Sequence, residues 1–108
     1  MSEVKQSRRE SLQGFVEANP NDAFARYGLA LEFMNAGEFQ PAAAHFRALI
    51  EKNPEYVPGY LMFGQLLARM GQKEDARDTL RRGIAAARRA GNVHALNEME
   101  SFLLDLGS

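Results

Sequence analysis

The sequence predicts an all-α protein built from antiparallel helical hairpins. Helix breakers recur at a fixed spacing, because the interval from Pro20 to Pro54 equals the interval from Gly37 to Gly71. The segments between these breakers carry apolar residues at helical spacing, and none shows the apolar–polar alternation of a half-buried strand. The pattern therefore indicates a repeat of about 34 residues, with two helices in each copy.

The composition is that of one soluble globular domain, which we expect to span residues 1–108. Hydrophobic residues make up 45% of the chain and charged residues 25%. Thirteen Lys and Arg oppose fourteen Asp and Glu, so the net charge of -1 creates no field that attracts nucleic acid or an anionic membrane. The absence of Cys excludes disulfides, thiolate metal sites and cysteine nucleophiles.

The N-terminal segment carries no targeting signal that we recognise. Its first ten residues lack the apolar core of a signal peptide, and no apolar run approaches the roughly 20 residues that cross a bilayer. We therefore expect a cytoplasmic protein with no membrane partner.

The first predicted helix, residues 4–18, has the phase of the second helix of a hairpin. Leu12 lies one repeat length before Phe46, which lies one repeat length before Leu80. Residues 4–18 are therefore interpreted as an N-terminal half repeat.

The first full repeat is predicted over residues 23–56. Asn21 or Asp22 can cap its first helix, and Gly37 supplies the left-handed residue that ends it. The second helix follows and tolerates Pro41, because the first turn of a helix does not need that backbone donor.

The second full repeat is predicted over residues 57–90. Pro58 lies in the first turn of its first helix, which ends at Gly71. The next helix has Arg88 where the repeat would place a proline, so it continues to a stop at Gly91.

A closing helix is predicted over residues 92–106, with Asn92 as its cap. Its apolar side chains recur at steps of three and four residues and form one stripe: Leu96, Met99, Leu103 and Leu106.

Small and large residues also recur in phase between the two full repeats. In the first repeat they are Leu29, Ala30, Phe33, Ala42, Phe46 and Pro54, and in the second they are Tyr60, Phe63, Gly64, Leu67, Ala76 and Leu80. This pattern resembles the tetratricopeptide repeat, with departures at Arg26, in the place of the family's Trp, and at Arg88. The resemblance implies a short right-handed α-solenoid of about six helices, and a non-enzymatic module that binds protein segments on the surface lined by the first helices.

The chemistry of that surface can be described from the sequence. The helix that starts near residue 23 is apolar on nearly every side, so the second helix of its own hairpin cannot cover all of it and something else must cover the rest. The predicted binding surface consists of Phe24, Tyr27, Leu31 and Met34 in the first repeat, and of Leu61, Gln65, Ala68 and Arg69 in the second.

Three occupants are possible for this surface: a protein segment, a second copy of the chain, or the chain's own terminal helix. Family members that clamp the C-terminal carboxylate of chaperone tails use Lys and Asn here, whereas this chain has Tyr27 and Leu31. The resemblance therefore does not imply that specificity.

The alternative function is binding of RNA or an anionic surface by the Arg-rich second helix of the second repeat. Its basic residues are Lys73, Arg77, Arg81, Arg82, Arg88 and Arg89. Glu74, Asp75 and Asp78 lie among them, and Asp78 and Arg82 form a favourable pair four residues apart, which is typical of a solvated helix face.

The sequence predicts no enzyme, cofactor or metal site. His94, Glu98, Ser101 and Asp105 share one stripe of the closing helix, but about 10 Å of helical rise separates His94 from Ser101. His94 and Glu98 supply two ligands where zinc needs at least three, and His45 lies on another helix.

Overall fold

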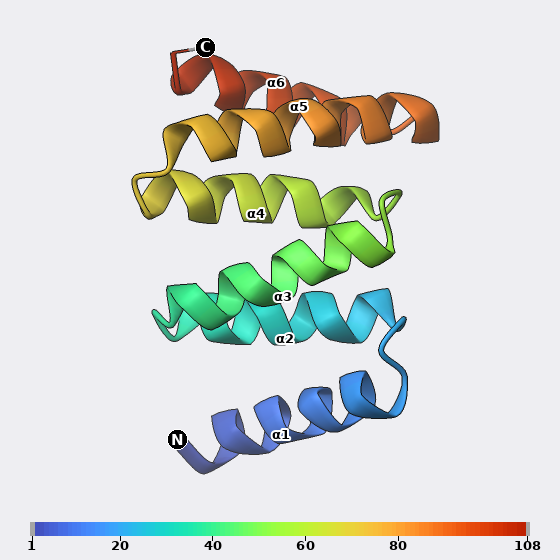
Figure 1. Ribbon diagram of the computed structural model, residues 1–108, viewed down its shortest axis with the longest axis vertical. Coiled ribbons are helices and arrows are strands. Elements are labelled where there is room, and N and C mark those ends of the chain that lie inside the picture. Colours follow the sequence, from blue (N-terminus) through green and yellow to red (C-terminus); the bar gives the residue numbers. More distant parts are fainter. Residues whose placement is uncertain (1, 108) are drawn as a thin grey trace. The chain divides into compact units, whose positions relative to one another are not determined.

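The computed structural model describes residues 2–107, with side chains from Arg8 onward, and these residues form six α-helices and no strand (Figure 1). The helices are α1 (Ser2–Ala18), α2 (Ala23–Asn35), α3 (Phe39–Lys52), α4 (Val57–Arg69), α5 (Lys73–Ala90) and α6 (Val93–Asp105). The prediction of an all-α protein of about six helices is confirmed.

The chain divides into two compact units, Met1–Asn53 and Pro54–Ser108. Unit 1 contains the α2–α3 hairpin with α1 beside α2, and unit 2 contains the α4–α5 hairpin with α6 (Figure 1). A single domain over residues 1–108 stays a prediction.

The hairpin turns depend on glycine, as predicted from the spacing of Gly37 and Gly71. Their φ angles are 78° and 80°, in the left-handed region that other residues adopt only with strain. In both hairpins the second helix starts two residues after the glycine, so that the two partners run antiparallel (Figure 1).

Side-chain caps start two of the helices. Of the two candidates before α2, Asp22 is the cap, and its carboxylate accepts a hydrogen bond of 3.0 Å from the backbone N–H of Ala25. The predicted cap of α6 is confirmed as well, because the Asn92 side chain accepts a 3.0 Å hydrogen bond from the N–H of Ala95.

In unit 1, α2 is packed by both of its neighbours. Its Ala25 and Leu29 form one cluster with Val16 of α1, and the half-buried Leu12 and Phe33 pack against this cluster. Helix α3 contributes fully buried side chains to the core of unit 1, and Phe46 is the largest of them. Within unit 1, α1 therefore packs on α2 through an apolar contact.

In unit 2, small residues let the helices approach closely. A Cβ added to Gly64 of α4 would lie 2.7 Å from Cδ2 of Leu80 on α5. A Cβ added to Gly83 of α5 would collide with Cβ of Tyr60 on α4 and lie 2.6 Å from Sδ of Met99 on α6. Gly83 is therefore the point at which all three helices of unit 2 meet.

We predict that Gly83→Ala lowers the stability of unit 2. The new methyl group meets Cβ of Tyr60, which cannot move without the backbone of α4, and overpacking of this kind costs about 1–3 kcal/mol. The midpoint of thermal unfolding, followed by circular dichroism, should fall.

Gly14→Ala on α1 is the matched control, because a Cβ at Gly14 meets nothing within 4 Å. Alanine in an open helical position should stabilise the protein by about 0.5–1 kcal/mol. Equal gains from both substitutions would contradict the close packing at Gly83.

Candidate functional site

The first-repeat part of the predicted binding surface lies on α2, and its exposure changes along the helix. Phe24 is 77% exposed, Tyr27 and Leu31 are half-buried, and Met34 is buried. Helix α1 packs against Ala25 and its cluster, and leaves Phe24 open. We refer to Phe24, Tyr27 and Leu31 as the α2 surface, because these three side chains retain exposed area.

Tyr27 is held in place by the hairpin. Its ring packs edge-on against the buried ring of Phe46 on α3, with the two centroids 6.3 Å apart and an angle of 66° between the rings. An aromatic side chain fixed in this way loses little conformational freedom when a partner covers it.

The second-repeat part of the predicted surface lies on α4 in unit 2. Leu61, Gln65 and Ala68 are half-buried, and Arg69 is exposed. Leu61 and Gln65 line a hollow of about 260 Å³ together with four residues of α6: Glu98, Ser101, Phe102 and Asp105. The closing helix therefore borders the α4 residues, and the hollow combines apolar and polar walls.

The polar stripe on α6 is divided between a hollow and the solvent. Glu98, Ser101 and Asp105 line the hollow, whereas His94 is 87% exposed and contacts Glu98 at 3.2 Å. Among the residues that the structure describes, no three His, Asp or Glu side chains are grouped so that they could hold a metal ion.

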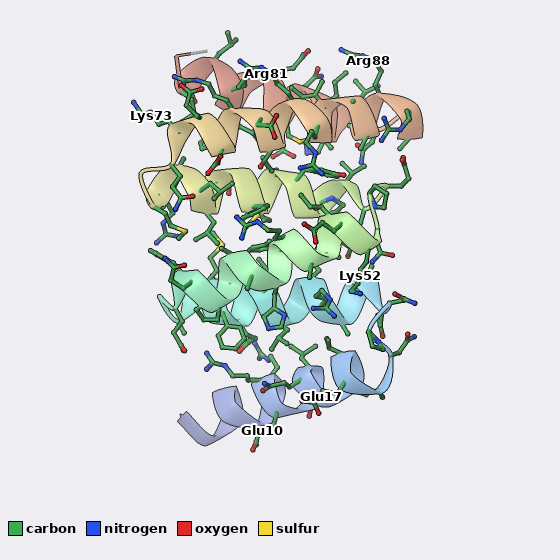
Figure 2. The ribbon with its side chains drawn as sticks, in the orientation of Figure 1. Glu10, Glu17, Lys52, Lys73, Arg81 and Arg88 are labelled. Atoms are coloured by element: carbon green, nitrogen blue, oxygen red, sulfur yellow. The ribbon has the colours of Figure 1, made fainter. Side chains whose placement is uncertain are left out.

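The basic residues of α5 mostly pair within unit 2. Arg77 contacts Glu74 at 2.6 Å and donates a 3.0 Å hydrogen bond to the carbonyl of Leu106, which joins α5 to the end of α6. The other contacts join Arg82 to the Tyr60 ring, Arg88 to Glu100, and Arg89 to Glu55. Lys73 and Arg81 are exposed, and Figure 2 shows them on α5 with Arg88.

A stack of cationic and aromatic side chains in unit 1 was not predicted. The guanidinium of Arg9 lies 4.3 Å from the centroid of the Phe33 ring, and Phe33 stacks on His45 at 5.5 Å with 8° between the rings. Nη1 of Arg26 lies 3.4 Å from Nδ1 of His45. The stack joins α1, α2 and α3, and Arg26 contributes to it from the place where the repeat pattern has Trp.

The stack changes the proton affinity of His45. Burial lowers the pKa of His45 below its ordinary value, and the positive charge of Arg26 lowers it further. The folded protein therefore favours the neutral imidazole, whose Nδ1 can accept a hydrogen bond from Arg26.

The comparisons with known proteins agree with the hairpin geometry. A family model described as tetratricopeptide repeat matches residues 33–98. This chain belongs to the tetratricopeptide repeat family. The TPR repeat-containing protein PA0015 of Pseudomonas aeruginosa is 30% identical over 97 residues, which cover 90% of this chain and 92% of that protein.

Solved structures of tetratricopeptide proteins have the same fold. The crystal structure of a tetratricopeptide repeat domain protein from Salinibacter ruber is 36% identical, with a TM-score of 0.76, and the match covers 80% of this chain and 96% of that one. The TPR2B domain of yeast Sti1, in a complex with pHsp70, has a TM-score of 0.88 at 17% identity, covering 98% and 85% of the two chains. This second likeness concerns the fold alone.

Within the described part of the chain, no helix is both long enough and apolar enough to span a membrane.

We predict that His45 makes stability depend on pH. In the unfolded chain its pKa is about 6.5, and in the folded protein it is lower, so the unfolded state binds the proton more readily. The contribution of His45 is complete above about pH 6.5 and declines as the pH falls below that value. The urea midpoint should therefore decrease between pH 7.5 and pH 5.5.

His45→Phe preserves an aromatic ring against Phe33 and removes the titrating group, so its urea midpoint should depend less on pH than that of the wild type. The control His94→Gln changes an exposed histidine and should keep the dependence due to His45. The same pH dependence in His45→Phe and in the wild type would show that His45 is not responsible.

Proposed function

We propose that this chain is a non-enzymatic protein-binding module whose α2 surface takes an apolar segment of a partner. The observation that carries the proposal is Phe24, which remains 77% exposed on a helix whose Tyr27 and Leu31 continue the same apolar stripe. An exposed phenylalanine beside partly exposed aromatic and aliphatic side chains is typical of an interaction site.

The size of the α2 surface limits the affinity that it can provide. Covering three large side chains contributes about 4.5–9 kcal/mol at about 1.5–3 kcal/mol each, and this value is an upper bound because Tyr27 and Leu31 are already half-buried. Association costs at least about 4 kcal/mol in lost freedom of motion. A partner held tightly must therefore contact further residues. On unit 2 we propose a separate contact surface made of the α4 residues Leu61, Gln65, Ala68 and Arg69.

The chemistry of the surface favours an apolar segment over an acidic tail. Tyr27 and Leu31 occupy places in which carboxylate-clamping relatives have Lys and Asn, so the α2 surface offers no cation to a C-terminal carboxylate. The basic residues of α5 do not support polyanion binding as the main function either, because Arg77, Arg88 and Arg89 pair with carboxylates of unit 2.

We predict that Phe24→Glu weakens binding of apolar peptides roughly 10- to 100-fold, because a buried phenylalanine contributes about 1.5–3 kcal/mol. Phage-displayed peptides selected on the wild-type chain serve as probes, and fluorescence anisotropy measures their affinity. Phe24 makes little contact within unit 1, so the variant should keep its helical circular dichroism.

Glu10→Ala is the matched control, since Glu10 is exposed on α1 and points away from α2 (Figure 2). Peptide binding that survives Phe24→Glu but is lost in Arg81→Glu would contradict the proposal and favour the basic face of α5. A dimer in light scattering that Phe24→Glu dissociates would identify the second copy as the occupant. A cytoplasmic location stays a prediction.

A further inference from the structure

The hollow between α4 and α6 of unit 2 combines hydrocarbon with negative charge. We call it the α4–α6 hollow, and its lining residues are Leu61, Gln65, Glu98, Ser101, Phe102 and Asp105. Its two hydrophobic residues, Leu61 and Phe102, are half-buried, whereas its two carboxylates, Glu98 and Asp105, are exposed. The hollow therefore has carbon in its half-buried part and negative charge in its exposed part.

The lining supplies no positive charge to balance these carboxylates. All six lining residues belong to the part of the chain that the structure describes, and none of them is basic. Helix α6 has no Lys or Arg, and the basic residue of α4 is Arg69, one turn beyond Gln65 and outside the lining. On α5, the guanidinium of Arg77 is engaged by Glu74 at 2.6 Å and by the carbonyl of Leu106 at 3.0 Å.

Asp105 lies in an unfavourable place for a carboxylate. It is the last residue of α6, and the C-terminal end of a helix carries a partial negative charge that favours cations. The last turn of α6 has no basic residue, whereas the last turns of α4 and α5 have one or two. Within the described part of the chain, Asp105 has no ion-pair partner. A cation brought by a partner would relieve this repulsion.

Glu98 has a contact that an incoming cation can replace. Nε2 of His94 lies 3.2 Å from Oε1 of Glu98, and the two carry opposite charges only while the imidazole is protonated. The His94 side chain is 87% exposed, and an exposed contact of this kind contributes little to stability. Glu98 therefore stays accessible to an ammonium or guanidinium group.

The size of the hollow suits one long basic side chain. Its volume of about 260 Å³ lies below the roughly 300–1,000 Å³ that is typical of small-molecule sites. Lys and Arg side chains pack their methylene stems on apolar surface and keep the charged end in water. Leu61 and Phe102 provide carbon for the stem, and an aromatic ring such as Phe102 also attracts a nearby cation.

We propose that the α4–α6 hollow binds a Lys or Arg side chain of a partner's protein segment. The proposal rests on the proposed function, since Leu61 and Gln65 belong to the contact surface of unit 2, and it adds the chemistry of the partner there. Glu98 and Asp105 lie seven residues apart, about 10 Å along α6, with Ser101 between them. A charged end beside Ser101 is therefore attracted by both carboxylates.

The test is a titration of the isotope-labelled whole chain with capped pentapeptides, followed by two-dimensional NMR at low salt. The first peptide has a lysine between two pairs of alanines and should shift the backbone amide signals of the lining residues. Added sodium chloride should weaken its binding. A peptide with norleucine in place of the lysine keeps the stem without the charge and should bind several-fold more weakly, and one with glutamate should not bind.

Removal of each carboxylate tests its contribution. Glu98→Gln and Asp105→Asn should each weaken binding of the lysine peptide roughly 2- to 5-fold, and the double variant should weaken it further. Both replace an exposed carboxylate by a neutral amide of the same shape, so the helices should remain, which circular dichroism checks.

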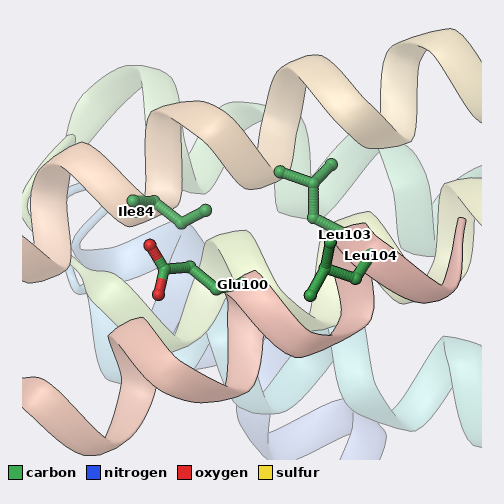
Figure 3. Close-up of a pocket in the computed structure, with 4 residues that line it drawn as sticks. All are labelled: Ile84, Glu100, Leu103 and Leu104. Carbon is green, nitrogen blue, oxygen red and sulfur yellow. The ribbon is translucent and has the colours of Figure 1, made fainter. Parts of the chain in front are cut away.

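Glu100→Gln is the matched control. Glu100 is also a carboxylate of α6, but it lines a different hollow with Ile84, Leu103 and Leu104 (Figure 3) and contacts Arg88 at 3.9 Å. The variant changes the net charge as much as Glu98→Gln does, and it should bind the lysine peptide like the wild type.

Three results would overturn the proposal. The first is equal binding of the lysine and norleucine peptides, which would show that charge plays no part. The second is equal weakening in Glu100→Gln and in Glu98→Gln, which would indicate attraction to α6 as a whole. The third is the absence of any shift with the lysine peptide up to concentrations of tens of millimolar.

Phe24→Glu separates this proposal from the role of the α2 surface. Phe24 lies on α2 in unit 1, so the variant should bind the lysine peptide like the wild type while losing affinity for the selected apolar peptides. If the lysine peptide does not bind and Phe24→Glu still loses the apolar peptides, only the cation site fails. If Phe24→Glu keeps the apolar peptides and the lysine peptide binds as expected, only the role of the α2 surface fails.

Discussion

Close approach of paired helices is the constraint on which the rest of the structure depends. At Gly64 and Gly83 there is no room for a Cβ atom without movement of a neighbouring side chain. Helices α4 and α6 can therefore lie this close to α5 only because these two residues have no side chain. Leu80, Tyr60 and Met99 fill the space that results. The packing of unit 2 thus depends on its small residues as much as on its large apolar side chains.

The sequence predicts the helices well because the signals that start and stop them are local. Gly37 and Gly71 need only their own backbone conformation, and Asp22 needs only a donor three residues away. The stack of Phe33 on His45 is different, since it depends on which side chains face each other once α2 and α3 have paired. The bond from Arg77 to the carbonyl of Leu106 spans 29 residues and follows no periodic pattern.

The candidate site shows the same division between local pattern and tertiary packing. The sequence identifies the apolar stripe on α2, but periodicity treats Phe24 and Met34 alike, whereas one is exposed and the other buried. On α4, Leu61 and Gln65 are bordered by Phe102 and the carboxylates of α6, which gives that part of the surface a mixed character. Unit 1 therefore offers a partner aromatic carbon, whereas the hollow of unit 2, taken by itself, combines apolar and polar walls.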